Sequence, residues 1–490
     1  MGDLVLGVDV GTTATKAVAY SADGADHGHG EAPHRLEEPE PGAAVQDPEA
    51  LYEAVGDAVR DAVAGLDPAR VAAISFSATM HGLLATDASG DPLGPLITWA
   101  DSRAGDVARE LRRRRDGRDA LALHRRTGTP VHPMSPLVKL AWLRRERPSL
   151  LAAAHTWGGI KEFVLARATG ARVTDTSCAS ATGLLDVATG IWDAEALEIA
   201  GIDAGRLGEL VAPTAVVGRL RERDWGLPAG VPVVAGGADG PLANLGVGAV
   251  RPGVAACSIG TSGALRVTVE RPAVDPRGRV FCYDLADGRW VVGGAITNGG
   301  LVLDWAHETL GRDVDTLLAA AADVPAGADG LLALPHLLPE RAPYWDAGGA
   351  GALVGLHRRH GPGHVTRALL EGVCLQLRLV LDALREAGLA VHEVRATGGF
   401  ARSALWRRLL TDALDLPVGF PVVDQGSAFG AALLGMQGVG LLAPGPDALV
   451  DAAERIPIAE TLLPGGDAAV HAARLPVFEQ VHDLLEDVDL

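Results

Sequence analysis

Short apolar runs separated by a glycine-rich turn open the chain. Residues 4–10 (LVLGVDV) are almost wholly apolar, which is typical of a buried β-strand. A second apolar-rich run covers residues 15–20, directly after the turn Gly11-Thr12-Thr13. Glycine and hydroxyl residues between two apolar runs favour a tight turn, so the two runs are predicted to form a β-hairpin.

An amphipathic helix and another strand follow the hairpin. Asp47-Pro48 combines a helix-capping side chain with the residue preferred at the first helical position. The apolar residues that follow recur every four positions, at Leu51, Val55, Val59 and Val63. This spacing predicts a helix with one buried face. Residues 71–76 form another predicted strand, and strands that alternate with helices indicate an α/β fold.

The second half of the chain has the same alternation. Strands are predicted at residues 231–235, 254–259 and 394–397, with a long helix over residues 365–386 that ends at Gly388. A further helix is predicted to begin near Ser403, and a small-residue helix covers 428–435. Residues 37–42 are predicted to form an exposed loop.

The run 254–263 resembles the opening hairpin. Both have a strand, a glycine and two hydroxyl residues in that order. We interpret the match as a distant internal repeat, although a chance similarity of this length is the alternative. The predicted domains are residues 1–244 and 245–490.

Composition narrows the class of protein. The chain has 490 residues, 48% of them hydrophobic and 21% charged, which indicates a globular protein of more than one domain. No apolar run approaches the ~20 residues of a membrane span, and the N-terminus lacks the features of a signal peptide. The four cysteines show no CxxC pair, so we expect them to be reduced, in a cytoplasmic protein with no membrane partner.

Charge excludes one partner and highlights three residues. The net charge of −19 argues against nucleic-acid binding, which needs a basic surface. Lys16, Lys139 and Lys161 are the only lysines in a chain otherwise rich in arginine. Each is therefore a candidate for a specific task, although a compositional bias alone explains the excess of arginine.

The opening hairpin carries the residue types that bind phosphate. Backbone N–H groups in a glycine turn, hydroxyls and a cation together hold phosphate groups. Gly11, Thr12, Thr13 and Lys16 supply all of these, and Asp9 can hold Mg²⁺. The alternative is an ordinary hairpin turn, and the Walker A spacing is absent.

Two further glycine turns fit the same ligand. Residues 260–263 (GTSG) would form a second phosphate turn, and two such turns, one in each domain, suit a nucleotide clamped between the domains. Residues 398–403 (GGFARS) can admit the adenine and ribose, because glycine turns accept a flat ring. Each segment, taken by itself, also fits a plain structural turn.

Together these motifs resemble the FGGY carbohydrate kinases, over nearly the whole chain. The most specific segment is 134–146 (MSPLVKLAWLRRE), which fits the family's first signature at every constrained position. The second signature region resembles residues 397–403, with Phe400 where a small residue is common. The resemblance implies an α/β fold with two actin-like, RNase H-like ATPase domains and an interdomain cleft.

The resemblance also implies ATP and Mg²⁺ as cofactors, and a role for each motif. Asp239 matches the catalytic base, and Asp9 and Asp239 match the metal-binding carboxylates; read alone, Asp239 is a turn residue after a strand. A carboxylate within reach of a hydroxyl can accept its proton during phosphoryl transfer. The implied nucleotide-binding residues are Gly11, Thr12, Thr13, Lys16, Gly260, Thr261, Gly300, Asp304, Gly399 and Ser403.

The same resemblance places the substrate in the first domain. The implied substrate-binding residues are Met80, His81, Trp99, Asp101, Arg103, His132, Met134, Lys161 and Asp239. Residues 127–136 and 159–162 resemble gluconate kinases of this family, whereas the Met80 and Trp99 segments are shared with xylulose kinases.

The predicted substrate is therefore a small sugar or sugar acid. D-Gluconate is the first choice, and D-xylulose or another pentulose is the alternative. Gluconate needs a local cation, for which Lys161, Arg103 and His132 are candidates, although His132 also fits a structural role beside two prolines. Lys139 is expected to be structural. A homo-oligomer such as a dimer is compatible with the family, and a silent sensor or an actin-like ATPase explains the motifs less well.

Overall fold

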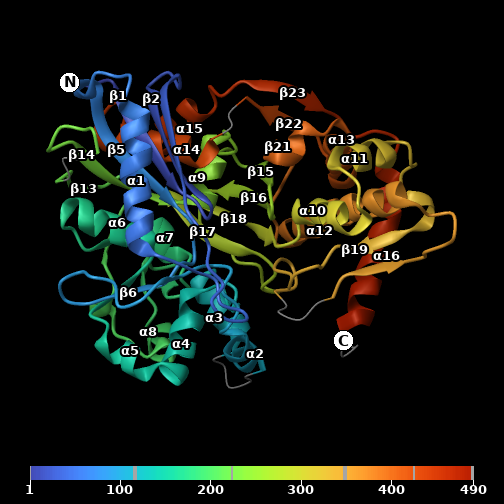
Figure 1. Ribbon diagram of the computed structural model, residues 1–490, viewed down its shortest axis with the longest axis horizontal. Helices are drawn as coiled ribbons and strands as arrows, with labels where there is room; N and C mark the ends of the chain where they lie inside the picture. Colours follow the sequence, from blue (N-terminus) through green and yellow to red (C-terminus); the bar gives the residue numbers. More distant parts are fainter. Residues whose placement is uncertain (1, 114–118, 222–224, 346–349, 423–424, 487–490) are drawn as a thin grey trace. The chain divides into compact units, whose positions relative to one another are not determined.

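The computed structural model describes residues 2–113, 119–221, 225–345, 350–422 and 425–486. They form two compact units (Figure 1). Unit 1 contains residues 1–251, 268–292 and 425–456, and unit 2 contains residues 252–267, 293–424 and 457–490. Each unit therefore draws on separate stretches of the sequence, and we describe each by itself.

A six-stranded sheet forms the centre of unit 1. Its strands lie in the order β13 (Val216–Arg219), β14 (Pro232–Ala238), β5 (Val71–Ala78), β1 (Leu4–Val10), β2 (Ala14–Ser21) and β3 (Asp26–Pro33). Strands β14, β5 and β1 are parallel, whereas β2, β3 and β13 are antiparallel to their neighbours. The predicted opening hairpin is thus confirmed. The polar strand β3 escaped the sequence analysis because it has few apolar positions to mark it.

Helices cover both faces of this sheet. On one face, Leu6 and Val8 pack with α1 (Pro48–Val63) and α6 (Ile160–Thr169) in one apolar core. As predicted, the Asp47 side chain caps α1 by accepting the N–H of Glu49.

On the other face, α14 (Gly426–Gly438) lies against β1 (Figure 1). A side-chain carbon at Gly7 would come within 1.9 Å of the Ala428 carbonyl oxygen. A side-chain carbon at Gly435 would come within 2.6 Å of Val5. The small residues of α14 therefore let a helix from late in the sequence approach the first strand closely.

A second apolar core lies in the same unit, among short helices. They are α2 (Gly105–Arg113), α3 (Ala120–Thr127), α4 (Pro136–Glu146), α5 (Pro148–Ala153) and α8 (Ala194–Ala200). The ladder of β4 (Val45–Gln46) with β7 (Leu96–Ile97) leads into the loop that carries Trp99. Helix α4 is the most specific FGGY-like segment, and the Ser135 side chain caps it.

Unit 2 is built on another mixed sheet. The sheet includes, in spatial order, β18 (Arg289–Ile296), β16 (Gly263–Val269), β15 (Val254–Ile259), β21 (Glu393–Thr397), β22 (Val418–Pro421) and β23 (Ile458–Leu462). Its helices include α10 (Leu301–Leu310), α11 (Val314–Ala322), α12 (Pro362–Glu386), α13 (Ala404–Leu414) and α16 (Ala468–Glu486). The predicted long helix is α12, which begins three residues earlier than expected because Pro362 occupies its first turn.

The two sheets share a local arrangement. Strand β1 pairs antiparallel with β2 and parallel with β5, and β15 pairs antiparallel with β16 and parallel with β21. The structure thus supports the internal repeat predicted from the sequence.

Two further expectations concern the whole chain. All four cysteines are free thiols, and three of them are buried. Within the described residues, every helix is too short or too polar to cross a bilayer.

Candidate active site

The turn between β1 and β2 presents backbone N–H groups to an anion. Gly11 N–H donates to the Ala14 carbonyl at 3.1 Å, and a side-chain carbon at Gly11 would lie only 2.8 Å from that oxygen. Within the described residues, the N–H groups of Thr12 and Thr13 have no hydrogen-bond acceptor. Such unpaired amides form a concavity that suits phosphate.

Asp9 and Lys16 place opposite charges beside this turn. They face each other in the pairing of β1 with β2, and Ser77 Oγ donates to Asp9 Oδ1 at 2.6 Å. Burial raises the pKa of Asp9, and the Ser77 hydrogen bond and Lys16 oppose the rise. A nearby cation would therefore stabilise the ionised form of the Asp9 carboxylate.

The residues present are compatible with Mg²⁺. This ion is commonly held by one or two carboxylates together with waters and substrate phosphates, rather than by a cage of side chains. Asp9 and Asp239 fit that donor set. Within the described residues, one tight group of three metal-ligating side chains occurs, formed by Glu162, Asp175 and Cys178. Asp9 and Asp239 are not part of that group.

Asp239 is the first residue of α9 (Asp239–Gly246), directly after β14. Strands β14 and β1 lie on either side of β5, and all three are parallel, so Asp239 and Asp9 approach the same edge of the sheet. The N–H of Gly240 donates to Asp239 Oδ1 at 2.8 Å. A carboxylate at this edge of the sheet has an oxygen that can accept a proton, as a general base must.

Met80 and His81 lie just beyond β5. His81 has a φ of 68°, in the left-handed region that is uncommon for a residue with a side chain. Its Nδ1 donates to the Ala181 carbonyl at 2.8 Å, and its ring meets Tyr283 edge-on at 5.7 Å. The ring orientation of His81 is therefore fixed by the protein.

Trp99, Asp101 and Arg103 come together on the loop after β7. Trp99 Nε1 donates to Thr12 Oγ1 at 3.0 Å, which joins a predicted sugar residue to the phosphate turn. Arg103 forms a bidentate pair with Asp101 and a second ion pair with Glu40. Its positive charge is therefore balanced by two carboxylates.

Lys139 holds two of the predicted substrate segments. Its side chain is fully buried, and its Nζ donates to the carbonyls of His81 at 2.7 Å and Thr98 at 2.6 Å. Burial lowers the pKa of Lys139 to about 7, although Asp101 opposes the shift. The structural role expected for Lys139 thus consists of fixing the segments that carry His81 and Trp99.

Lys161 lies in a buried cluster of ionisable groups. It forms an ion pair with Asp175, beside Glu162 and Cys178. Burial alone would lower the pKa of Lys161, but Asp175, Cys178 and Glu162 together more than offset it, and the pKa is raised. Because a carboxylate already neutralises the ammonium, the cluster has less positive charge to offer than the sequence indicates.

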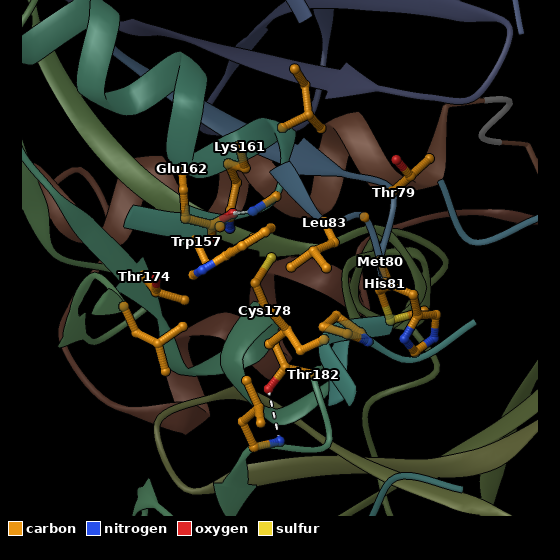
Figure 2. A pocket seen from close by; sticks show the side chains of 18 of the residues that line it. Thr79, Met80, His81, Leu83, Trp157, Lys161, Glu162, Thr174, Cys178 and Thr182 are labelled. Carbon is orange, nitrogen blue, oxygen red and sulfur yellow. Dashed lines mark hydrogen bonds between the residues drawn. The ribbon is translucent and has the colours of Figure 1, made fainter. Parts of the chain in front are cut away.

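A cavity of about 40 Å³ brings Met80, His81 and Lys161 together. Figure 2 shows Lys161, Glu162 and Trp157 on one side of it and Met80 and His81 on the other. Its volume suits a few water molecules rather than a sugar. Trp99, Asp101, Arg103, His132 and Met134 do not line it.

His132 and Met134 lie just before α4. The Met134 N–H donates to His132 Nδ1 at 3.2 Å, and the Met134 side chain is buried. This bond holds the His132 ring beside the start of the Met134 main chain.

A pocket of about 500 Å³ in unit 2 collects every nucleotide-binding residue that was predicted there. It is lined by Gly260, Thr261, Gly300, Asp304, Gly399 and Ser403, together with Asp315, Phe400, Arg402 and Trp406 among others. Ser403 caps α13 by accepting the N–H of Trp406 at 3.3 Å. Within the described residues, the N–H groups of Thr261 and Ser262 also lack an acceptor, as in the first turn.

Several residues of these sites were missed by the sequence analysis. Asp175, Glu162 and Cys178 surround Lys161, and Gln46 contacts the phosphate turn. Glu162 lies in the segment 159–162 that the resemblance had identified, although no role was predicted for it, and Gln46 is a polar residue directly before the Asp47 helix cap. Asp175 lies 14 positions from Lys161 in the sequence, so no local pattern joins them.

Both halves of the chain match models of one enzyme family. Residues 4–246 match the N-terminal domain of the FGGY family of carbohydrate kinases, and residues 255–438 match its C-terminal domain. The chain therefore belongs to this family, whose members use ATP as co-substrate. The predicted fold class and carbohydrate kinase activity are confirmed.

Individual relatives include kinases for different sugars. A gluconokinase from Bacillus subtilis is 39% identical over 90% of this chain and 88% of its own length. A gluconate kinase from Lactobacillus acidophilus superposes with a TM-score of 0.93 at 32% identity, over 99% of this chain and 98% of its own. A ligand-bound xylulose kinase from the same species has a TM-score of 0.93 at 33% identity, with the same coverage.

Proposed function

We propose that this FGGY kinase transfers the γ-phosphoryl group of ATP to D-gluconate, giving 6-phospho-D-gluconate and ADP. The observation that carries the proposal is the similarity to a gluconokinase at 39% identity over 90% of the chain. The segments 127–136 and 159–162, which resemble gluconate kinases, support the same choice.

The predicted catalytic, metal-binding and nucleotide-binding residues each have a task in this reaction. Asp239 accepts the proton of the attacking hydroxyl, late in a transition state that is mostly dissociative. Lys16 and the amides of Thr12 and Thr13 stabilise charge on the phosphate oxygens. The 500 Å³ pocket of unit 2 receives the nucleotide. Asp9 and Asp239 hold Mg²⁺, which when bound neutralises charge on the transferred phosphoryl group.

One structural observation favours a neutral substrate instead. The two strongest candidate cations, Lys161 and Arg103, already have carboxylate partners. A cation that already has a carboxylate partner contributes less binding free energy to a second carboxylate, that of the substrate. Phosphorylation of D-xylulose or another pentulose is therefore the second candidate function.

A substrate panel separates the two candidates. ADP release is measured with Mg²⁺-ATP and, in turn, D-gluconate, D-xylulose, L-ribulose and glycerol. We expect the highest kcat/KM with D-gluconate. Turnover of a neutral ketose without turnover of D-gluconate would overturn the proposal in favour of a pentulose kinase.

The control for this panel is Asp239→Asn. We expect the variant to fold and to bind both substrates but to lose well over ~100-fold in kcat, because the amide cannot accept the proton. Near-normal turnover would contradict the assignment of Asp239 as the base.

The domain boundary at residues 244/245, the cytoplasmic location and a homodimer stay predictions. Size-exclusion chromatography with light scattering measures the last of these directly.

A further inference from the structure

Two side chains hold the phosphate turn of unit 1 through Thr12. Gln46 Nε2 donates to the Thr12 carbonyl at 2.9 Å, and Trp99 Nε1 donates to Thr12 Oγ1 at 3.0 Å. Gln46 is only 2% exposed, which is uncommon for a glutamine. Thr12 is therefore held at both its carbonyl and its hydroxyl oxygen.

The two donors come from one small element. Gln46 lies in β4, and Trp99 follows β7, and these strands pair with Val45 opposite Ile97 and Gln46 opposite Leu96. The N–H of Thr98 also donates to the Ala44 carbonyl at 3.0 Å. The β4–β7 ladder thus fixes the distance between the two donors.

The hydrogen bond to the Thr12 carbonyl also orients an amide. In a trans peptide, the C=O of one residue and the N–H of the next point in opposite directions. The Thr13 N–H therefore points away from Gln46, and it is one of the amides without an acceptor among the described residues. The Thr13 carbonyl accepts the His34 N–H at 3.0 Å, which restrains the next peptide in the same way.

We propose that Gln46 and Trp99 are positioning residues that keep the amides of the Gly11–Thr13 turn directed at the nucleotide phosphates. This inference rests on the proposed phosphate-binding role of the turn. Without the Gln46 donor, a partly buried carbonyl loses its partner and the peptide is free to rotate. Pre-oriented dipoles contribute to phosphoryl transfer only while they stay aligned, so both affinity for ATP and turnover fall.

The same contact links the turn to the sugar segment. Trp99 shares its loop with Asp101, and the preceding carbonyl, of Thr98, accepts a hydrogen bond from Lys139. A sugar that contacts Trp99 therefore acts on the residue that also fixes Thr12. We expect loss of the Trp99 donor to weaken the dependence of ATP hydrolysis on sugar.

The first test compares two buried glutamines. Gln376 in α12 is fully buried and also donates to a carbonyl, that of Ala342 at 2.9 Å, but no predicted site residue contacts that carbonyl. Dissociation constants of ATP and ADP are measured calorimetrically, without sugar, for Gln46→Leu, Gln376→Leu and the wild type.

We expect Gln46→Leu to bind ATP ~10-fold more weakly, which corresponds to the loss of one or two hydrogen bonds. Gln376→Leu should bind ATP as the wild type does. Equal ATP affinity for Gln46→Leu and the wild type would overturn the positioning role. Failure of the wild type itself to bind ATP would instead contradict the proposed function.

A pH profile tests the same contact without relying on a leucine variant that folds. In Gln46→Glu, an ionised carboxylate faces the Thr12 carbonyl and repels it, whereas the protonated acid donates to it again. His34 Nδ1 lies 3.2 Å from Gln46 Nε2 and would pair with the new carboxylate, so the variant and its reference protein both carry His34→Asn. We therefore expect the ATP affinity of this variant, relative to the reference, to recover as the pH falls from 8 towards 5. An affinity ratio that stays constant over this range would overturn the proposal.

The third test removes only the indole N–H. Trp99→Phe keeps an aromatic ring, and we expect it to raise the KM for ATP ~3-fold or more and to raise the ratio of ATP hydrolysis to sugar phosphorylation. A change confined to the KM for the sugar would show that Trp99 acts on the sugar alone.

Discussion

The two phosphate-type turns of this kinase have the same exposed amides but are held in different ways. In unit 1, the Thr12 carbonyl accepts a hydrogen bond from the Gln46 side chain. In unit 2, backbone N–H groups bind the carbonyls of the turn instead. The Gly300 N–H donates to the Gly260 carbonyl at 2.6 Å, and the Gly299 N–H donates to the Thr261 carbonyl at 3.1 Å. The first turn is therefore positioned by two side chains in addition to main-chain bonds, and the second by the main chain.

Charge differs between the two turns as well. The first hairpin pairs Asp9 with Lys16. Counted along the sequence from the glycine of each turn, the positions of Asp9 and Lys16 are occupied in the second hairpin by Ser258 and Leu265, two residues before and five after Gly260. Across the strands, Ser258 pairs with Ala264, so no charged pair faces this turn either. The difference shows that a repeated backbone motif can present similar amides while only one copy carries the charged chemistry. Substitutions should therefore affect the two turns differently.

The largest effect is expected from Gly299→Ala in unit 2. A side-chain carbon there would lie 2.6 Å from the Ser262 carbonyl carbon and 2.7 Å from its oxygen, and neither is able to move aside easily. The turn must shift, and a misplacement of about 1 Å costs ~100-fold in rate. We expect kcat/KM for ATP to fall by about that factor in steady-state assays.

The control for this prediction is Gly361→Ala, at a position where an added carbon meets nothing within 4 Å. This variant should keep wild-type kinetics. Normal kinetics in Gly299→Ala would show that the main-chain contacts do not position the second turn.

The next largest effect is expected from Lys16→Met in unit 1. The variant keeps most of the side-chain volume but removes the cation beside the phosphate turn, so transition-state charge loses a partner worth ~2–3 kcal/mol, or ~30–150-fold in kcat. Single-turnover kinetics at saturating ATP measure the change.

Leu265→Met is the matched substitution on the second hairpin. Leu265 is fully buried, so its exchange for methionine should cost under ~1.5 kcal/mol of stability and leave kcat unchanged. Similar losses of kcat in the two variants would remove the distinction in charge between the turns.

A smaller difference is expected between two threonines. Thr12→Val removes the acceptor of the Trp99 N–H, so we expect ~3–10-fold loss in kcat/KM for ATP. Thr261→Val breaks no hydrogen bond of its side chain within the described residues, and we expect less than ~3-fold loss. Equal losses of kcat/KM in the two variants, measured under identical conditions, would mean that the hydrogen bond from Trp99 to Thr12 does not contribute to the use of ATP.

The smallest effect concerns stability and pH. Burial raises the pKa of Asp9 above its usual 3.8, so the folded protein binds this proton more tightly than the unfolded chain does. The contribution of Asp9 to the free energy of unfolding therefore falls as the pH rises from about 3.8 through the raised folded value.

Asp9→Asn removes this contribution. We expect the variant to be less active but more stable than the wild type at pH 7, with the difference in stability vanishing below pH 3.8. Denaturant unfolding at several pH values measures it. Ser258→Ala, on the other hairpin, should show no such dependence on pH.

Local patterns in the sequence predicted most of the elements that carry these turns. The apolar runs around Gly11 and Gly260, the cap at Asp47 and the helix start near Ser403 depend on neighbouring residues and can be read directly. The polar strand β3 lacks such a pattern. The ion pair of Lys161 with Asp175 and the contact of Gln46 with Thr12 depend on chain folding over longer distances, so periodicity does not reveal them.

The assignment of roles relied on resemblance more than on local pattern. Asp239 read alone is a turn residue, and the structure places it at the start of a helix. Its role as the base, like the other site roles, stays a prediction until the variants are measured.

The close contact of α14 with β1 has a consequence for synthesis of the protein. Gly7 packs on Ala428, so the helix that covers the first strand is synthesised more than 400 residues after it. During translation, one face of the opening sheet therefore has no native covering until the chain is nearly finished, and an exposed apolar sheet is prone to aggregation. A nascent chain stalled before residue 426 should consequently depend on chaperones, and truncated forms of unit 1 should express poorly.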